Sequence, residues 1–248
     1  MTAQSPENYW INRGADVVGM EGVTEGENTN QAPVYRRLAQ TIVLSNVNHV
    51  VDIGCNVGQL ALFLRRQGYR GSYQGIDSNP HAIEVARKNL EGVEGYSFEE
   101  GNLRWLDIRS YSQMMVVTKD VIEHLEDDTL FSKLLDISRR YVLIASFLPW
   151  IDSESIIEQT ADGYYMNHYN RARMLDLAAE HHFALAEMVT VASADGWQNQ
   201  VVLFERQPKN ELESTPAEEA FVEDVRPGPD EAKTLSVSAK KKPVAKSK

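Results

Sequence analysis

Short apolar runs alternate with longer amphipathic segments through the middle of the chain. The runs have the length of strands, and the segments between them carry apolar residues at helical spacing, which predicts parallel strands joined by crossover helices. The predicted strands are His49–Ile53, Tyr73–Ile76, Tyr96–Glu99, Met114–Thr118, Tyr141–Ser146, Ala184–Ala192 and Gln200–Glu205. The predicted helices are Val34–Leu44, Gly58–Gln67, Pro80–Glu91, Asp127–Ser138 and Arg171–His182.

The last two predicted strands differ from the others because only the turn-rich segment ADGWQN separates them. A crossover helix does not fit into so short a connection, so we expect this pair to form an antiparallel hairpin. The sequence therefore predicts an α/β fold with a seven-stranded, mostly parallel sheet. Helices are expected on both faces of this sheet, and the antiparallel hairpin lies at its C-terminal end.

The two ends of the chain differ in composition from its middle. Residues 208–248 are rich in Pro, Glu, Lys, Ser and Ala without a sustained apolar period, so we expect a disordered tail. Its basic end, KKKPVAKSK, is suited to contact an acidic partner or anionic lipid, or is a solubilising tail. We expect residues 1–33 to be a cap or loop segment, because residues 19–30 are glycine-rich and aperiodic. The folded domain is then predicted over residues 34–207.

Composition and charge narrow the classes of function. The 248-residue chain has a formal net charge of −11, and the charges of residues 208–248 cancel, so the acidity belongs to residues 1–207. An acidic domain repels polyphosphate, which disfavours a long nucleic acid as partner and leaves small molecules and sugars. Its one cysteine, Cys55, excludes an intramolecular disulfide and favours a reduced, cytoplasmic setting. We expect no transmembrane segment, because no apolar run approaches the ~20 residues that one needs.

The segment Asp52–Leu60 carries the clearest sign of a ligand site. A predicted strand ends at Ile53, a turn with Gly54 and Gly58 follows, and an amphipathic helix begins there. Such a turn lets a ligand approach the backbone closely, and the start of a helix offers unpaired N–H groups. The fingerprint G-x-G-x-x-G is absent, so a pyrophosphate is not the expected ligand. An ordinary strand–turn–helix junction is the alternative.

Polar residues follow the next two predicted strands at the same edge of the sheet. Asp77 ends the second strand, where a carboxylate can accept hydrogen bonds from both hydroxyls of a ribose. Asn102 follows the third strand, where its amide can bond an adenine edge beside the apolar Leu103. Taken singly, Asp77 is also typical of a helix cap, and Asn102 of a turn. Their shared place after successive strands favours a nucleoside site.

In these residues the chain resembles the class I S-adenosylmethionine-dependent methyltransferases, over roughly Val34–Arg206. Their first motif is similar to Asp52–Gly58, with Asn56 in place of the usual middle glycine, and Asn also adopts left-handed backbone geometry. The resemblance implies a Rossmann-like fold and S-adenosylmethionine as the cofactor. It implies cofactor contacts from Asp52, Gly54, Cys55, Asn56, Gly58, Gln59, Asp77, Ser78, Asn102, Leu103 and Asp120.

The segment after the fourth predicted strand bears on the methyl acceptor. Asp120-x-x-Glu123-His124 is similar to the Glu-x-x-Glu-His element of ubiquinone-pathway O-methyltransferases and small-RNA 2′-O-methyltransferases. The Asn/Asp-Pro-Pro-aromatic element of base- and amide-methylating branches is missing. The resemblance implies a divalent metal held by Glu123, His124 and His168, with Asp120 nearby. One alternative is a metal-free site in which His124 or His168 acts as the general base, so all four residues are candidate catalytic residues. Another is that the Glu-His pair only packs or forms hydrogen bonds, as in metal-free relatives.

Two aromatic segments, Tyr9–Gly14 and Leu148–Asn170, are suited to cap the cofactor or cover the acceptor, or they anchor on the core. From these patterns we predict transfer of a methyl group from S-adenosylmethionine to a hydroxyl of a small molecule or sugar. The alternatives are N- or C-methylation of a small metabolite, 2′-O-methylation of an RNA end, and a non-catalytic scaffold that binds the cofactor.

Overall fold

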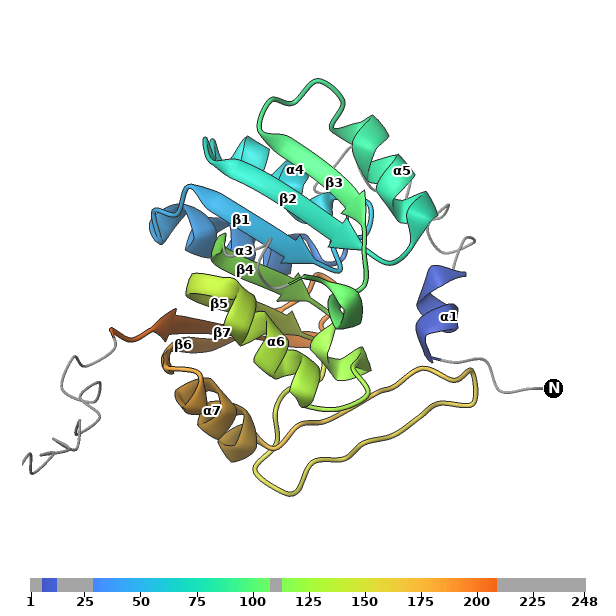
Figure 1. Cartoon of the computed structure of the whole chain (residues 1–248), viewed down its shortest axis with the longest axis vertical. Helices are drawn as coiled ribbons and strands as arrows, with labels where there is room; N and C mark the ends of the chain where they lie inside the picture. The colour runs from blue at the N-terminus through green and yellow to red at the C-terminus, as the bar shows by residue number, and fades with distance from the viewer. Residues whose placement is uncertain (1–5, 13–28, 108–112, 209–248) are drawn as a thin grey trace, which may run out of the picture. The chain divides into compact units, whose positions relative to one another are not determined.

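A seven-stranded sheet in the order β3-β2-β1-β4-β5-β7-β6 forms the centre of the fold (Figure 1). The computed structural model describes residues 6–12, 29–107 and 113–208. The strands are β1 (His49–Ile53), β2 (Ser72–Asp77), β3 (Tyr96–Glu100), β4 (Gln113–Lys119), β5 (Ser138–Ser146), β6 (Phe183–Ala192) and β7 (Gln198–Arg206). The helices are α1 (Pro6–Ile11), α3 (Ala32–Leu44), α4 (Gln59–Arg66), α5 (Pro80–Asn89), η1 (Leu103–Trp105), η2 (Ile122–His124), α6 (Thr129–Ile137) and α7 (Arg171–Glu180).

The strand pairing confirms the predicted topology. β1 lies between β2 and β4 and is parallel to both, while β3 and β5 extend the parallel part on either side. β7 pairs with β5 in the antiparallel sense, and β6 pairs with β7 in the same way, which is the predicted hairpin. Four of the five residues of β1 are buried, as expected for a parallel strand that is covered on both faces.

Two apolar layers enclose the sheet, because successive side chains of a strand point to opposite faces. Val50 belongs to the core formed with α3, α4 and α5, and Val51 belongs to the core formed with α6 and α7. Figure 1 shows α6 and α7 on the near side of the strands and α3 on the far side. Helices on both faces are therefore confirmed. In the part of the chain that the structure describes, no helix is long and apolar enough to cross a membrane.

Local sequence explains where the helices begin. The side chain of Asn79 caps α5, with Oδ1 accepting hydrogen bonds from the N–H groups of His81 at 3.0 Å and Ala82 at 3.2 Å. Pro80 occupies the first turn, where its missing N–H costs nothing. α3 begins at Ala32, slightly before the predicted start. The predicted domain boundaries remain predictions, since residues 1–5, 13–28 and 209–248 lie outside the described part.

Candidate active site

The turn after β1 has the backbone geometry that its glycines and asparagine favour. Gly54, Asn56 and Gly58 have φ angles of 76°, 49° and 80°, all in the left-handed region. A Cβ atom on Gly54 would lie 2.3 Å from Cγ2 of Val121, so this position requires glycine for space as well. The Gly54 N–H donates to the carbonyl of Ile76 at 2.7 Å, which ties the turn to the end of β2.

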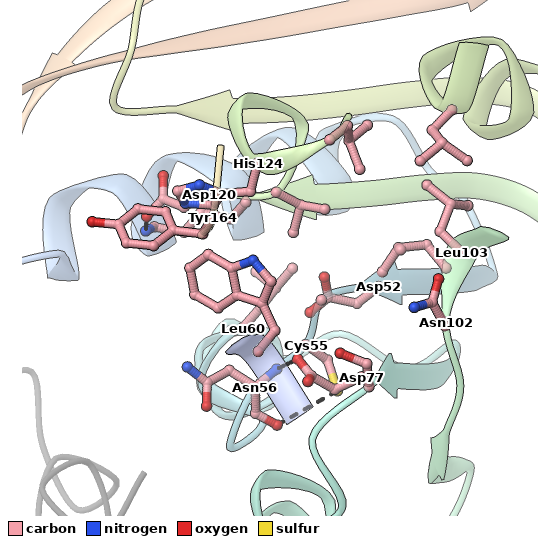
Figure 2. Close-up of a pocket in the computed structure, with 18 of the residues that line it drawn as sticks. Asp52, Cys55, Asn56, Leu60, Asp77, Asn102, Leu103, Asp120, His124 and Tyr164 are labelled. Atoms are coloured by element: carbon pink, nitrogen blue, oxygen red, sulfur yellow. Dashed lines mark hydrogen bonds and ion pairs between the residues drawn. The ribbon is translucent and has the colours of Figure 1, made fainter. Parts of the chain in front are cut away.

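Asp77 ends β2, and its carboxylate organises this edge of the sheet. Oδ2 accepts a hydrogen bond from the Asn56 N–H at 2.8 Å, drawn in Figure 2, and Oδ1 accepts one from the Asn79 N–H at 2.9 Å. Burial raises the pKa of Asp77, while the backbone hydrogen bonds favour the charged form and oppose that shift. Each carboxylate oxygen has a second lone pair, so Asp77 can also accept hydrogen bonds from a ligand.

Asp52 and Cys55 lie beneath the same turn. Asp52 is 3% exposed, and the Tyr73 hydroxyl donates a hydrogen bond to its Oδ2, which links β1 to β2. Burial raises the pKa of Asp52 to about 7, against the hydrogen bond from Tyr73, which lowers it. Cys55 is buried as well, and burial raises the pKa of its thiol well above the usual range. The thiol is therefore suited to packing and not to nucleophilic attack.

Asn102 and Leu103 follow β3 as predicted. The Oδ1 atom of Asn102 accepts a hydrogen bond from the Arg104 N–H at 2.9 Å and so caps η1. The Nζ atom of Lys133 donates to the Leu103 carbonyl at 3.1 Å and holds η1 against α6. Asn102 thus has the structural role that is typical of a turn residue. It also lies at the edge of the sheet, where a ligand can reach it.

A cavity of about 1070 Å³ is lined by the segments that follow β1, β2, β3, β4 and β5. Its lining includes most of the predicted cofactor residues, which are Asp52, Gly54, Cys55, Asn56, Gln59, Asp77, Ser78, Asn102, Leu103 and Asp120. Gly58 is not in the lining, and its role is to start α4 in a left-handed conformation beside Leu90 and Phe98. In Figure 2, Asn102 and Leu103 lie on one side of Asp52, and Asp120, His124 and Tyr164 lie on the other.

β4 ends in a charged pair that lines the cavity. The Lys119 ammonium forms an ion pair with Oδ2 of Asp120 and lies 5.2 Å from the centre of the Tyr35 ring. Asp120 has a φ angle of 54°, which is uncommon outside glycine. Its Oδ1 is buried and has no hydrogen-bond partner among the described residues. The Tyr35 hydroxyl donates to Oε1 of Gln59 at 2.6 Å, so α3 and α4 are joined at this wall.

An aromatic wall, formed by Tyr9, Trp10, His124, Phe147 and Tyr164, lines the cavity beyond β4. Tyr9 stacks on Tyr164 with 4.4 Å between the ring centroids, and Trp10 packs on His124 at 4.5 Å. His124 also lies 5.8 Å from the ring of Phe147. The two aromatic segments proposed as cap and lid therefore meet at the cavity, one from α1 and one from the long connection after β5.

His124 and Glu123 are neighbours in η2 but have different surroundings. The Nδ1 atom of His124 lies 2.6 Å from the Tyr165 carbonyl, which makes Nδ1 the protonated nitrogen that donates. Glu123 is 1% exposed, and its Oε1 accepts hydrogen bonds from Oγ of Ser146 at 3.0 Å and the Phe147 N–H at 3.3 Å. Burial, and then the charge of Asp120, raise the pKa of Glu123 to about 8.

Comparisons with known proteins now place the fold. Residues 50–141 match the profile of a family described as a methyltransferase domain. Similar solved structures include magnesium protoporphyrin IX methyltransferase from Synechocystis PCC 6803 with bound S-adenosylmethionine, at 16% identity and a TM-score of 0.60 over 84% of this chain and 100% of that chain. The fold is that of a class I methyltransferase. Another similar solved structure is 1,6-didemethyltoxoflavin-N1-methyltransferase from Burkholderia thailandensis. It has 16% identity and a TM-score of 0.56 over 84% of this chain and 93% of that chain.

No curated protein sequence matches the chain. The domain match, together with the Rossmann-like sheet and its antiparallel end, supports a class I S-adenosylmethionine-dependent methyltransferase. These comparisons do not distinguish methyltransferases that act on oxygen from those that act on other atoms. Both similar structures are too distant in sequence to carry residue roles to this chain, so the roles of its residues rest on its own geometry.

The predicted metal site does not form in this methyltransferase fold. Across residues 6–12, 29–107 and 113–208, no group of three or more His, Cys, Asp and Glu side chains is arranged to hold a metal ion. Glu123 is hydrogen-bonded inside the core, His124 lines the cavity, and His168 does not line it. The backbone of His168 forms an isolated bridge with Ile156 instead. These residues do not fit a bound metal, and His168 is removed from the catalytic candidates.

Two residues of the candidate site were missed by sequence reasoning. Tyr35 has the spacing of an ordinary core residue on its helix, and nothing in that pattern points to the cavity. Lys119 gave a weak signal, because a lysine that directly follows an apolar strand and precedes Asp120 is placed beside the predicted site. Both line the cavity, and they meet there through the contact of the Lys119 ammonium with the Tyr35 ring.

Proposed function

We propose that the chain transfers a methyl group from S-adenosylmethionine to a hydroxyl of a small molecule or sugar. The observation that carries this proposal is a cavity that residues from the carboxyl ends of β1, β2, β3, β4 and β5 line together, with His124 among them. The cofactor is supported by the methyltransferase-domain match and by similar structures that hold S-adenosylmethionine or S-adenosylhomocysteine. The single buried thiol of Cys55 supports a reduced compartment, and the cytoplasm is the proposed location.

The cavity residues fit the parts of the cofactor. Asp77 is proposed to accept hydrogen bonds from the ribose hydroxyls, and Asn102 with Leu103 to contact the adenine. The carboxylate of Asp77 is already held in place by two backbone N–H groups, so little ordering is needed when the ligand binds. When bound, S-adenosylmethionine supplies an electrophilic methyl group on a positively charged sulfonium. Asp52 also lines the cavity, and its ionised form favours a cationic ligand there.

His124 is the proposed general base. The hydrogen bond from Nδ1 to the Tyr165 carbonyl sets the tautomer in which Nε2 carries the lone pair. An acceptor hydroxyl must lose its proton as it attacks the methyl group, and an imidazole can take that proton at neutral pH. Contacts with the rings of Trp10 and Phe147 hold the imidazole in this orientation. The mechanism uses no metal, because Glu123 and His168 do not join His124 in a ligand set.

The aromatic wall defines the proposed acceptor subsite. Tyr9, Trp10, Phe147 and Tyr164 offer flat apolar faces beside His124, and such faces suit a sugar or a planar ring that carries the reacting hydroxyl. The acidic domain disfavours a long polyphosphate, so we do not propose a nucleic-acid duplex as the acceptor. The aromatic wall therefore supports an acceptor that carries a ring, and a screen identifies it.

A screen with methyl-labelled S-adenosylmethionine tests the proposal. Metabolites are pooled as hydroxyl, amine and carbon nucleophiles, and labelled products are identified by mass spectrometry. We expect transfer to oxygen. His124→Gln should lower kcat by about 10²–10⁴, the usual contribution of a general base, without changing the Kd for S-adenosylmethionine. His168→Gln is the matched control outside the cavity, with kcat unchanged. A labelled product methylated on nitrogen or carbon would overturn the choice of acceptor.

A further inference from the structure

A second, smaller pocket lies beside the main cavity, on the side of the proposed base. It has a volume of about 260 Å³ and is lined by Gln31, Asp120, Phe147, Asp195 and Trp197. Gln31, Asp120 and Phe147 line the main cavity as well, so the two spaces adjoin. The ring of Phe147 also lies 5.8 Å from that of His124. A molecule whose hydroxyl lies at His124 can therefore reach this side pocket past Phe147.

Asp195 and Trp197 belong to the turn between β6 and β7, and hydrogen bonds hold this turn in place. The Ser193 N–H donates to the Trp197 carbonyl at 2.8 Å, and the Ser193 hydroxyl donates to Oδ1 of Asp195. The Ala194 N–H donates to the Asn30 carbonyl at 2.7 Å, which ties the turn to the segment before α3. The side pocket is thus formed before a ligand binds, so little ordering is needed on binding.

The charges of the side pocket favour a positively charged group. Hydrogen bonds, above all the one from Ser193, lower the pKa of Asp195, so its carboxylate is ionised at neutral pH. The charge of Asp120 is already paired with that of Lys119. Among the described residues that line the side pocket none is basic, so the negative charge of Asp195 dominates there.

Two further features suit an ammonium group. Trp197 is 62% exposed, so much of its ring is open to contact with a cation. Oε1 of Gln31 is buried and has no hydrogen-bond partner in the described part of the chain, so a donor from a ligand would stabilise it. An ammonium has three N–H donors and a positive charge, whereas a hydroxyl has one donor and no charge. An ammonium can therefore contact the carboxylate, the amide oxygen and the ring together.

We propose that the side pocket binds a protonated amine of the methyl acceptor, an inference that rests on the proposed function. The acceptor is then an amino-substituted ring compound whose hydroxyl lies at His124 and whose ammonium lies between Asp195 and Trp197. Phe147 separates the ammonium from the proposed base, so the amine serves recognition and the hydroxyl receives the methyl group. Neutral phenols and neutral sugars are weaker acceptors, because they leave the charge of Asp195 without a partner.

Matched pairs of ligands test the contact with the amine. Tyramine and 4-ethylphenol differ only in the amino group, and so do glucosamine and 2-deoxyglucose. Isothermal titration uses the full chain saturated with S-adenosylhomocysteine, so that no methyl transfer occurs. In at least one pair the wild-type protein should bind the amine about tenfold more tightly than its neutral partner, the effect of one charge-assisted hydrogen bond. Equal affinities within both pairs, or no binding of either amine at millimolar concentration, would overturn the proposal.

Variants of the turn assign the preference for the amine to the side pocket. Asp195→Asn removes the charge but keeps an oxygen for Ser193, and it should weaken the amine by about three- to tenfold and its neutral partner by less than about twofold. Trp197→Leu should weaken the amine by roughly two- to fivefold, the effect of a lost cation–π contact. Asp176→Asn, the same change as Asp195→Asn on the exposed side of α7, should alter neither affinity. If Asp195→Asn keeps the full preference for the amine, the side pocket does not bind it.

The outcomes separate this inference from the proposed function. If both members of a pair are methylated on oxygen with equal kcat/KM, the proposed function stands and this inference fails. If the methyl group goes to the amine nitrogen, the amine lies at the methyl donor and not in the side pocket, so the inference and the choice of oxygen both fail. If no adenosyl ligand binds the wild-type protein at all, the proposed function itself fails. The wild-type comparison needs no variant, so poor folding of a variant does not prevent the test.

Discussion

Replacing Asp77 with alanine should damage both the fold and the cofactor site, because one carboxylate serves both. In the structure its oxygens accept hydrogen bonds from the Asn56 N–H at 2.8 Å and the Asn79 N–H at 2.9 Å. Alanine leaves both donors without that acceptor, one in the turn after β1 and one before α5. A hydrogen bond to a charged group contributes about 1.5–3 kcal/mol. Burial raises the pKa of Asp77 and so weakens the charged form, which favours the lower end of that range.

Two such bonds give a loss of about 3 kcal/mol in the free energy of unfolding, measured by urea denaturation without ligand. For a domain of this size the melting temperature should fall by roughly 6–12 °C. Two lost contacts to the ribose hydroxyls should raise the Kd for S-adenosylmethionine by about a hundredfold in isothermal titration. Unchanged affinity would refute the ribose assignment, and a stability loss below about 0.5 kcal/mol would refute the structural role.

Asp127→Ala is the matched control for Asp77→Ala. The Oδ1 atom of Asp127 accepts a hydrogen bond from the Thr129 N–H at 2.9 Å just before α6, so this carboxylate also orders a helix start. Asp127 does not line the cavity. The control should lose some stability and keep its affinity for S-adenosylmethionine. If both variants lose affinity in proportion to their loss of stability, the effect of Asp77 on binding is indirect.

Two further predictions concern stability. Gly54→Ala places a methyl group 2.3 Å from Val121 Cγ2 at a φ angle of 76° and should lower the free energy of unfolding by more than about 2 kcal/mol. Gly196→Ala, at a φ angle of 90° with nothing within 4 Å, should cost only about 1 kcal/mol; equal losses in urea denaturation would contradict the clash. Burial raises the pKa of Glu123 to about 8, so the folded state retains a proton that the unfolded state loses near pH 4.3. The free energy of unfolding of the wild type, relative to that of Glu123→Gln, should be greatest below about pH 4.3. It should decline from there toward pH 8 by on the order of 1 kcal/mol per pH unit. Parallel curves of unfolding free energy against pH for the two proteins would rule this out.

Much of the sheet was predictable because burial leaves a direct pattern in the sequence. The largely buried run His49–Ile53 reflects a strand covered by helices on both faces. The short ADGWQN connection leaves no room for a crossover. The start of β5 was not predictable in the same way. The strand begins at Ser138, but its early residues Arg139 and Arg140 are exposed. The apolar pattern therefore starts only at Tyr141.

The proposed cofactor residues could be selected from the sequence because they lie at or shortly after the ends of the predicted strands. Asn56 adopts the left-handed backbone that its type allows, and Asp77 lies where the resemblance implies a ribose acid. Tyr35 and Lys119 became site residues only because α3 and β4, far apart in the chain, meet at the cavity. A pattern of apolar spacing along one helix contains no information about that meeting, so the charged end of the site was incomplete from sequence alone.

The expected metal ligands do not come together among the described residues, because sequence spacing does not determine the direction of side chains. Glu123 and His124 are adjacent, but the 3₁₀ turn that holds them buries the carboxyl against Ser146 and places the imidazole on the cavity. The buried carboxyl accepts the Phe147 N–H and so supports the wall that contacts the ring of His124. An acid that the resemblance implies as a metal ligand thus affects the site through the position of its neighbours. Its removal is expected to disturb the orientation of the proposed base.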